Sequence, residues 1–216
     1  MADSDAAVPR AVQVPWQRLP GWVERYDARH PGTSWCFGCG AATASSPDGT
    51  RVHVALPFPT DALTSWEAIA VHLSKPWRLG VVLVRRGGFA VASVVGADLE
   101  LVKVSRRHVQ GKTKAGGWSQ QRFANRRANQ ARQAFDAAAE YAAEILLPRA
   151  HRLDQVVTGG DRQAVAAVFA QPRLKPLAAR PQRWLGGVAD PTRAVLDEAV
   201  TTARAVKVEI TDGPGG

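Results

Sequence analysis

The fold of this chain is decided by residues 79–109, which carry the sequence LGVVLVRRGGFAVASVVGADLELVKVSRRHV. Three apolar runs lie within it: Leu79 to Arg85, Phe89 to Val95 and Leu99 to Val109. The runs are separated by Gly87-Gly88 and by Gly96-Ala97-Asp98. Short β-branched runs joined by glycine-rich turns are typical of hairpins, so this stretch predicts an antiparallel meander of three strands.

A loop and a long helix are predicted on the C-terminal side of the meander. Residues 110–118, QGKTKAGGW, are polar and rich in glycine, which predicts an exposed loop. From Ser119 to about Leu147, apolar residues recur in steps of four and three, the period of an α-helix. This apolar stripe consists of Ala124, Ala128, Ala131, Phe135, Ala138, Ala142 and Ile145. Pro148 ends the predicted helix because proline lacks the backbone donor.

The rest of the chain alternates predicted helices and strands. On the N-terminal side we expect a helix from Trp16 to His30, a strand at 51–57 and a helix at 61–74. On the C-terminal side we expect a strand at 152–158, a helix at 161–170, a Pro- and Gly-rich connection at 173–191, a helix at 191–203 and a strand at 205–210. Helices that interleave with strands after a meander predict an α/β (α+β) fold, with a mixed β-sheet flanked by helices.

The composition is typical of a folded protein. The chain has 216 residues, of which 45% are hydrophobic and 22% charged. We expect a single domain over residues 12–210, a disordered N-terminal tail at 1–11 and a flexible C-terminal tail at 211–216. No apolar run reaches the roughly 18 residues of a membrane span, and the acidic start Met1-Ala2-Asp3-Ser4-Asp5 is unlike a secretory signal. We therefore expect a cytoplasmic protein with no membrane partner.

The positive charge is concentrated in one segment. The chain carries a formal net charge of +9, yet the charges outside residues 101–135 balance. Within that segment there are nine basic residues and no acidic one: Lys103, Arg106, Arg107, Lys112, Lys114, Arg122, Arg126, Arg127 and Arg132. Such a concentration indicates a binding surface for a polyanion, the alternative being a solvated basic face.

The predicted long helix has an unusual charge order. Arg122, Arg126 and Arg127 lie near its start, whereas Asp136, Glu140 and Glu144 form a row in its second half. The helix dipole favours the reverse order by about 0.3–1 kcal/mol for a well-placed charge. The early arginines therefore indicate an anionic partner at the loop end of the helix.

A single Cys-x-x-Cys pair, Cys36 and Cys39, leaves three interpretations open. Two thiolates supply half of a zinc site, but His30 and His53 do not have a usual zinc-ligand spacing to the pair. A redox pair requires a helix directly after it, which the sequence does not indicate. The pair can also be structural or incidental. The sequence contains no Walker loop, no G-x-G-x-x-G after a strand, no H-E-x-x-H and no G-x-S-x-G, so we expect no metal and no cofactor.

Residues 116–121, Gly-Gly-Trp-Ser-Gln-Gln, combine flexible backbone with an uncharged amide. Glycine permits close approach to another surface. A glutamine side chain both donates and accepts hydrogen bonds, so it can orient a water molecule and an ester carbonyl without acting as a base. Gly-Gly before a serine is also an ordinary helix start. Trp118 can stack on a nucleobase or pack on its own helix.

The run from Gly111 to Arg127, GKTKAGGWSQQRFANRR, resembles the catalytic loop and following helix of the Vms-like release factors, especially their actinobacterial branch. These proteins are peptidyl-tRNA hydrolases of ribosome-associated quality control. Their wider relatives are the middle domains of eukaryotic and archaeal release factors, whose Gly-Gly-Gln loop enters the peptidyl transferase centre. The Vms-like pattern is Gly-x-x-Gln, and Gly117-Trp118-Ser119-Gln120 fits that form.

The resemblance implies a release-factor middle domain, of RNase H-like architecture, with a glycine-rich loop that projects at 110–117. It implies hydrolysis of the ester between nascent peptide and tRNA on obstructed large ribosomal subunits, with Gln120 as the catalytic residue. The implied catalytic loop also contains Gly116, Gly117, Trp118, Ser119 and Gln121. The implied RNA-binding residues are Lys112, Lys114, Arg122, Arg126 and Arg127. The implied partners are the large-subunit rRNA and peptidyl-tRNA, bound by a monomer. The alternative is a non-catalytic rRNA- or tRNA-binding module.

Overall fold

The computed structural model describes residues 9–106 and 117–213, with the side chains of the long helix described from residue 129 onward. These residues form two compact units, one from residues 9–75 together with 204–213 and the other from 76–203. The sequence predicts a single domain over 12–210, whereas the structure has two units because each builds its own five-stranded sheet. The predicted tail at 1–11 differs as well, since a strand starts at Arg10, and residues 1–8 lie outside the described part.

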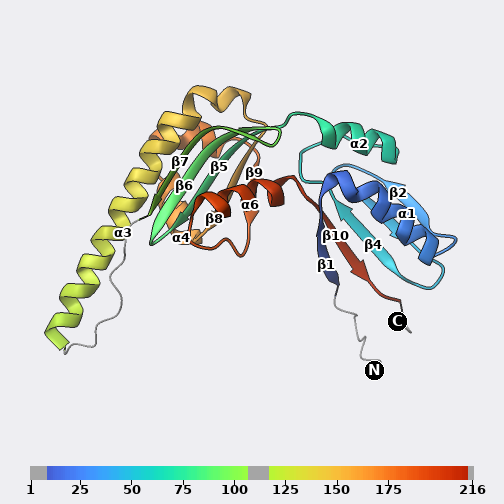
Figure 1. Ribbon diagram of the computed structural model, residues 1–216, viewed down its shortest axis with the longest axis horizontal. Coiled ribbons are helices and arrows are strands. Elements are labelled where there is room, and N and C mark those ends of the chain that lie inside the picture. Colours follow the sequence, from blue (N-terminus) through green and yellow to red (C-terminus); the bar gives the residue numbers. More distant parts are fainter. Residues whose placement is uncertain (1–8, 107–116, 214–216) are drawn as a thin grey trace. The chain divides into compact units, whose positions relative to one another are not determined.

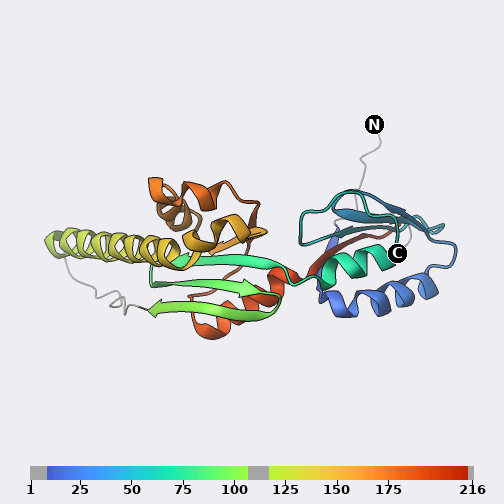
Figure 2. The ribbon, with the colours of Figure 1, turned by 90° about the horizontal axis from the view of Figure 1, so that it is seen from above.

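Unit 1 is an antiparallel sheet with two helices. Its elements are β1 (Arg10–Val14), η1 (Trp16–Arg18), α1 (Leu19–Arg29), β2 (Ser34–Phe37), β3 (Ala41–Ser45), β4 (Arg51–Ala55), α2 (Trp66–Ser74) and β10 (Val206–Thr211). The strand order is β1-β10-β4-β3-β2. Both helices lie on one face of the sheet (Figure 2), where Trp35 of β2 contacts Trp66 of α2 and Tyr26 of α1.

Unit 2 is a mixed sheet with helices on both faces. Its elements are β5 (Arg78–Arg85), β6 (Gly88–Val95), β7 (Asp98–Arg106), α3 (Gly117–Leu146), η2 (Leu147–Arg152), β8 (Gln155–Gly160), α4 (Arg162–Phe169), η3 (Pro172–Leu174), α5 (Lys175–Ala178), β9 (Gln182–Leu185) and α6 (Arg193–Arg204). The strand order is β7-β6-β5-β8-β9.

The meander predicted from residues 79–109 is confirmed as β5, β6 and β7, which pair antiparallel in chain order. β8 then pairs parallel to β5, and β9 pairs parallel to β8, so the sheet is mixed. α3 and α4 cover one face and α6 covers the other (Figures 1 and 2). The predicted fold class, a mixed β-sheet flanked by helices, is therefore confirmed.

The packing of α3 on the sheet forms the main core of unit 2. Ala138, Ala142 and Leu146 are fully buried against residues of β5 and β6 such as Val82 and Val91. Alanine on the contact face lets the helix approach the sheet closely, and the neighbouring apolar side chains fill the remaining space. The predicted apolar stripe is thus confirmed at its C-terminal end, whereas the side chains of residues 124 and 128 lie outside the described part.

The first half of α3 extends beyond the sheet (Figure 1). A helix of 30 residues is about 45 Å long, since each residue adds about 1.5 Å. A strand of eight residues such as β6 spans only about 26 Å, at about 3.3 Å a residue. The sheet can therefore cover only part of the helix, and the helix start stands clear of the sheet.

Two predicted segments on the C-terminal side of α3 differ from the structure. The strand expected at 152–158 begins at Gln155, because η2 continues the chain from α3 to Arg152 in 3-10 turns. The connection expected at 173–191 contains η3, α5 and β9. β9 is a four-residue edge strand that pairs only with β8 within the described sheet. Its strand conformation depends on a non-local pairing that local sequence does not indicate.

The close packing of α3 on the sheet can be tested with Ala138→Leu. Ala138 is completely buried, so three added carbons have no space, and we expect the free energy of unfolding to fall by about 1–3 kcal/mol. Glu140→Leu, at an exposed position of the same helix, is the matched control and should change it by no more than about 0.5 kcal/mol. Urea denaturation measures both; equal values would contradict the close packing.

Candidate functional site

The candidate catalytic segment lies between the end of β7 and the start of α3. β7 ends at Arg106, which pairs with Gly88 next to the β5–β6 turn, and α3 begins at Gly117. The end of unit 2 that carries the β5–β6 turn therefore also carries the end of β7. The predicted loop residues Lys112, Lys114 and Gly116 lie outside the described residues.

The helix starts two residues earlier than the sequence predicts. The sequence predicts a helix that begins at Ser119, whereas the first turn of α3 consists of residues 117–120. The first four backbone N–H groups of a helix have no acceptor within the helix, so a glycine at this end disrupts no regular ladder. The side chains of these residues lie outside the described part, and the catalytic role of Gln120 stays a prediction.

The helical backbone determines which predicted site residues share a side of α3. At about 100° per residue, Gln120 lies within about 40° of Ala124 and Gly117 within about 20°. Both therefore continue the stripe that packs on the sheet further along the helix. Gln121 lies at the edge of that stripe, while Arg122 and Arg126 lie on the opposite side of the helix. Arg127, seven residues from Gln120, returns to the same side as the glutamine.

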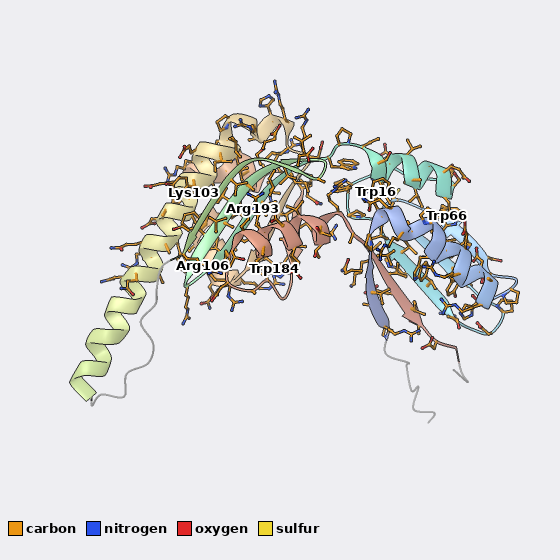
Figure 3. All side chains as sticks on the ribbon, viewed as in Figure 1. Trp16, Trp66, Lys103, Arg106, Trp184 and Arg193 are labelled. Carbon is orange, nitrogen blue, oxygen red and sulfur yellow. The ribbon has the colours of Figure 1, made fainter. Side chains whose placement is uncertain are left out.

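Three basic residues of the segment 101–135 have described side chains: Lys103, Arg106 and Arg132 (the first two are labelled in Figure 3). The Lys103 ammonium lies 4.4 Å from the centre of the Tyr141 ring of α3, and Phe89 stacks on the same ring at 5.7 Å. Arg106 and Arg132 are exposed, and neither forms an ion pair with any residue that the structure describes. The basic surface therefore extends from β7 onto α3.

The acidic row of α3 is also where the sequence predicts it. Asp136, Glu140 and Glu144 are exposed along one side of the second half of the helix. Their charges are separated from the helix start, where the early arginines lie. The unfavourable charge order along the helix is therefore present in the folded protein.

Cys36 and Cys39 lie in unit 1, and no helix follows them directly in the chain. Both are free and exposed, and Cys36 belongs to β2, which is followed by another strand. The nearby histidines pair with carboxylates: His30 Nδ1 lies 2.6 Å from Asp48 and His53 Nδ1 lies 3.6 Å from Glu209. The Thr50 backbone amide and, to a lesser extent, the His30 contact lower the pKa of Asp48. Among the described side chains, no three of the metal-binding types cluster.

Comparison with known families identifies the chain. The model of the Actinobacteria/chloroflexi VLRF1 release factors matches residues 77–209, which are more than half of the sequence. The chain belongs to this release-factor family. The match spans unit 2 and continues into β10 of unit 1. It confirms the family resemblance carried by residues 111–127.

Solved structures similar to this chain include two archaeal proteins. The archaeal translation termination factor aRF1 is 17% identical with a TM-score of 0.38, over 74% of this chain and 51% of that one. An archaeal protein is 15% identical with a TM-score of 0.35, over 93% of this chain and 68% of that one. The chain thus spans about half the length of the termination factor.

No curated protein sequence matches the chain. None of the described helices of this family member is long and apolar enough to cross a membrane.

The contact between Lys103 and Tyr141 joins β7 to α3, and a double-mutant cycle tests it. We expect Lys103→Met and Tyr141→Leu to be non-additive by about 0.5–1 kcal/mol in unfolding free energy, the usual strength of an ammonium–ring contact. Tyr141→Leu also removes the contact between Tyr141 and Phe89, and the double-mutant cycle subtracts this loss because it occurs with and without Lys103. Additivity within about 0.3 kcal/mol would contradict a contact that joins the two elements.

Proposed function

We propose that the protein is a peptidyl-tRNA hydrolase that releases nascent chains from tRNA on obstructed large ribosomal subunits. The observation that carries this proposal is the match to the VLRF1 release-factor family, together with Gly117-Trp118-Ser119-Gln120 at the head of α3. The pattern places a glycine and a glutamine three residues apart, on neighbouring positions of one helical turn. The substrate is the ester that joins the peptide to the terminal ribose of tRNA.

The proposed chemistry needs orientation and electrostatic stabilisation rather than a strong base. The Gln120 amide orients a water molecule, whose oxygen bonds to the ester carbonyl carbon. The bond from that carbon to the ribose oxygen breaks, and the proton lost by the water ends on the ribose oxygen. Negative charge develops on the carbonyl oxygen in between. The first turn of α3 supports this step, because the N-terminal end of a helix carries a partial positive charge and free N–H groups.

The basic residues around the loop are proposed to hold RNA. Lys112, Lys114, Arg122, Arg126 and Arg127 contact phosphates of rRNA and tRNA, and Trp118 stacks on a base. Arg122 and Arg126 lie opposite the Gln120 side of the helix, so α3 would meet phosphates on more than one side. That arrangement suits a helix end that enters an RNA-walled cavity and extends clear of its own sheet (Figure 1). The protein acts in the cytoplasm as a monomer.

The catalytic assignment is tested with large subunits that carry labelled peptidyl-tRNA. We expect the wild type to release free peptide and Gln120→Ala to abolish release while it still binds the subunits. Gln120 acts only on the reacting ester, whereas binding depends on phosphate contacts elsewhere.

Gln121→Ala is the matched control for the catalytic assignment, because it removes the same amide one position further along the helix. This variant should release peptide at close to the wild-type rate. If Gln120→Ala still releases peptide and Gln121→Ala does not, the catalytic residue is Gln121. Binding without release by the wild type would instead favour the non-catalytic RNA-binding module.

The paired substitution Arg126→Ala and Arg127→Ala tests the phosphate contacts. We expect weaker binding to the subunits, because the variant neutralises fewer phosphates and so displaces fewer counterions from the RNA. The slope of the logarithm of affinity against the logarithm of salt concentration should become shallower by about 1 for each phosphate that is no longer neutralised. Binding measured from low to high salt gives this slope. A wild-type slope in the paired variant would contradict the basic RNA-binding surface.

A further inference from the structure

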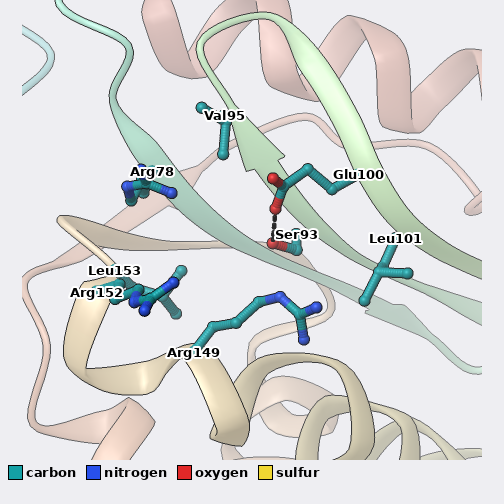
Figure 4. A pocket seen from close by; sticks show the side chains of 8 residues that line it. All are labelled: Arg78, Ser93, Val95, Glu100, Leu101, Arg149, Arg152 and Leu153. Atoms are coloured by element: carbon teal, nitrogen blue, oxygen red, sulfur yellow. Dashed lines mark hydrogen bonds between the residues drawn. The ribbon is translucent and has the colours of Figure 1, made fainter.

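A second basic site lies in unit 2, outside the segment in which the sequence concentrates positive charge. A pocket of about 310 Å³ opens where β5 begins, β6 ends and η2 follows α3. Its lining includes Arg78 of β5 and Arg149 and Arg152 of η2, together with Ser93, Glu100 and Leu101. Figure 4 shows Arg78 and Arg152 on one side of the pocket and the Arg149 guanidinium directed toward Leu101.

The three guanidinium groups have few partners of their own. Arg149 donates one hydrogen bond, of 3.2 Å, to the Ile145 carbonyl at the end of α3. Arg78 binds Asp154 through its backbone amide rather than its side chain. Within the described ranges, none of the three forms an ion pair. Arg78 and Arg152 are exposed and Arg149 is half buried, so donors remain available at the mouth and the wall of the pocket.

The single acidic residue in the lining, Glu100, bonds to a serine hydroxyl and forms no ion pair with the three arginines within the described residues. Ser93 is 2% exposed, and its hydroxyl donates to Glu100 Oε2 at 3.1 Å. The lining therefore carries three positive charges and one negative charge. An excess of two positive charges around a small open pocket suits a phosphate group, whose oxygens match the forked donors of arginine.

We infer that this pocket binds a phosphate group of RNA through Arg78, Arg149 and Arg152. The affinity for phosphate follows from the pocket itself, whereas RNA as its source rests on the proposed function. α3 separates Gln120 from the pocket by nearly its full length, about 40 Å at about 1.5 Å per residue. A ligand that reaches both the ester and the pocket must be an extended polyanion, and RNA has that extent and a phosphate at every nucleotide. The pocket then anchors the end of unit 2 that is remote from the ester.

The test compares full-length variants on large subunits that carry labelled peptidyl-tRNA. Arg78→Ala with Arg152→Ala removes two exposed charges, and we expect about tenfold weaker binding and a salt slope shallower by about 1. Release at saturating protein should be unchanged because Gln120 is intact. Arg149→Lys keeps the charge but loses the fork, and it should weaken binding as well. Glu100→Gln should tighten binding because it removes a negative charge from the pocket.

The matched control is Arg173→Ala with Lys175→Ala, which removes two exposed charges of unit 2 outside the pocket lining. It should leave binding near the wild-type value. Equal weakening by both pairs would show that only total charge matters and would overturn the pocket. Titration with inorganic phosphate alone distinguishes the two sources of the phosphate group. If the pocket pair loses phosphate binding but still binds the subunits normally, the ligand of the pocket is a small phosphate compound, and the assignment to RNA is overturned.

The same experiments separate this inference from the proposed function. Weaker binding by the pocket pair, with full release by both Gln120→Ala and Gln121→Ala, would support the pocket and overturn the catalytic assignment. Normal subunit binding by the pocket pair, with release abolished only in Gln120→Ala, would overturn RNA binding by the pocket and leave the hydrolase intact.

Discussion

The packing of α3 on β5 and β6 is the interaction on which the rest of unit 2 depends. Fully buried alanines at 138 and 142 allow the helix to lie close to Val82 and Val91. This packing fixes the direction in which α3 leaves the sheet, and therefore where its first turn lies. It also fixes η2, which follows the helix directly and carries two of the pocket arginines. Both the candidate catalytic residue and the second basic site are thus positioned by one helix.

α3 carries the candidate catalytic residue in its first turn, and the pocket arginines of η2 follow its last turn. The helix therefore sets the distance between the two sites. Substrate positioning requires the reacting groups to be held within a fraction of an ångström, and long loops do not provide this. In this protein Gln120 belongs to the helix itself by its backbone. The glycine-rich residues before it lie outside the described part of the chain. We infer that the helix provides the orientation and that the preceding glycines permit the approach to RNA.

The sequence predicted the parts of the fold that depend on local pattern. The β5–β7 meander and the α3 stripe have strong periodicity, and both are confirmed. The sequence does not predict β1, β2, β3 and β9, because they are only four or five residues long. β1 and β9, in addition, pair with segments that are distant in the sequence. The pairing of β10 with β1 and β4 is equally non-local, since it joins segments across most of the chain.

In the functional sites, too, the sequence reveals only residues that are close together in the chain. The Gly-x-x-Gln pattern and the basic run are contiguous in sequence, so composition and motif find them. Arg78, Arg149 and Arg152 are dispersed along the chain, and their charges are cancelled in a linear count by acids elsewhere. Only the fold brings them to one pocket. The detectable signal was the pair of arginines three residues apart just after the long helix, which alone does not indicate a partner.

The order of strands in unit 1 has a consequence for how the protein is made. β10, from Val206 to Thr211, lies inside the sheet between β1 and β4. Residues 10–55 therefore cannot complete their sheet before residues 206–211 have been made, whereas residues 76–203 contain every strand of the second sheet. During synthesis unit 2 can fold first, and unit 1 must wait until residues 206–211 have left the exit tunnel. Until then β1 and β4 each keep an unpaired edge open to other chains.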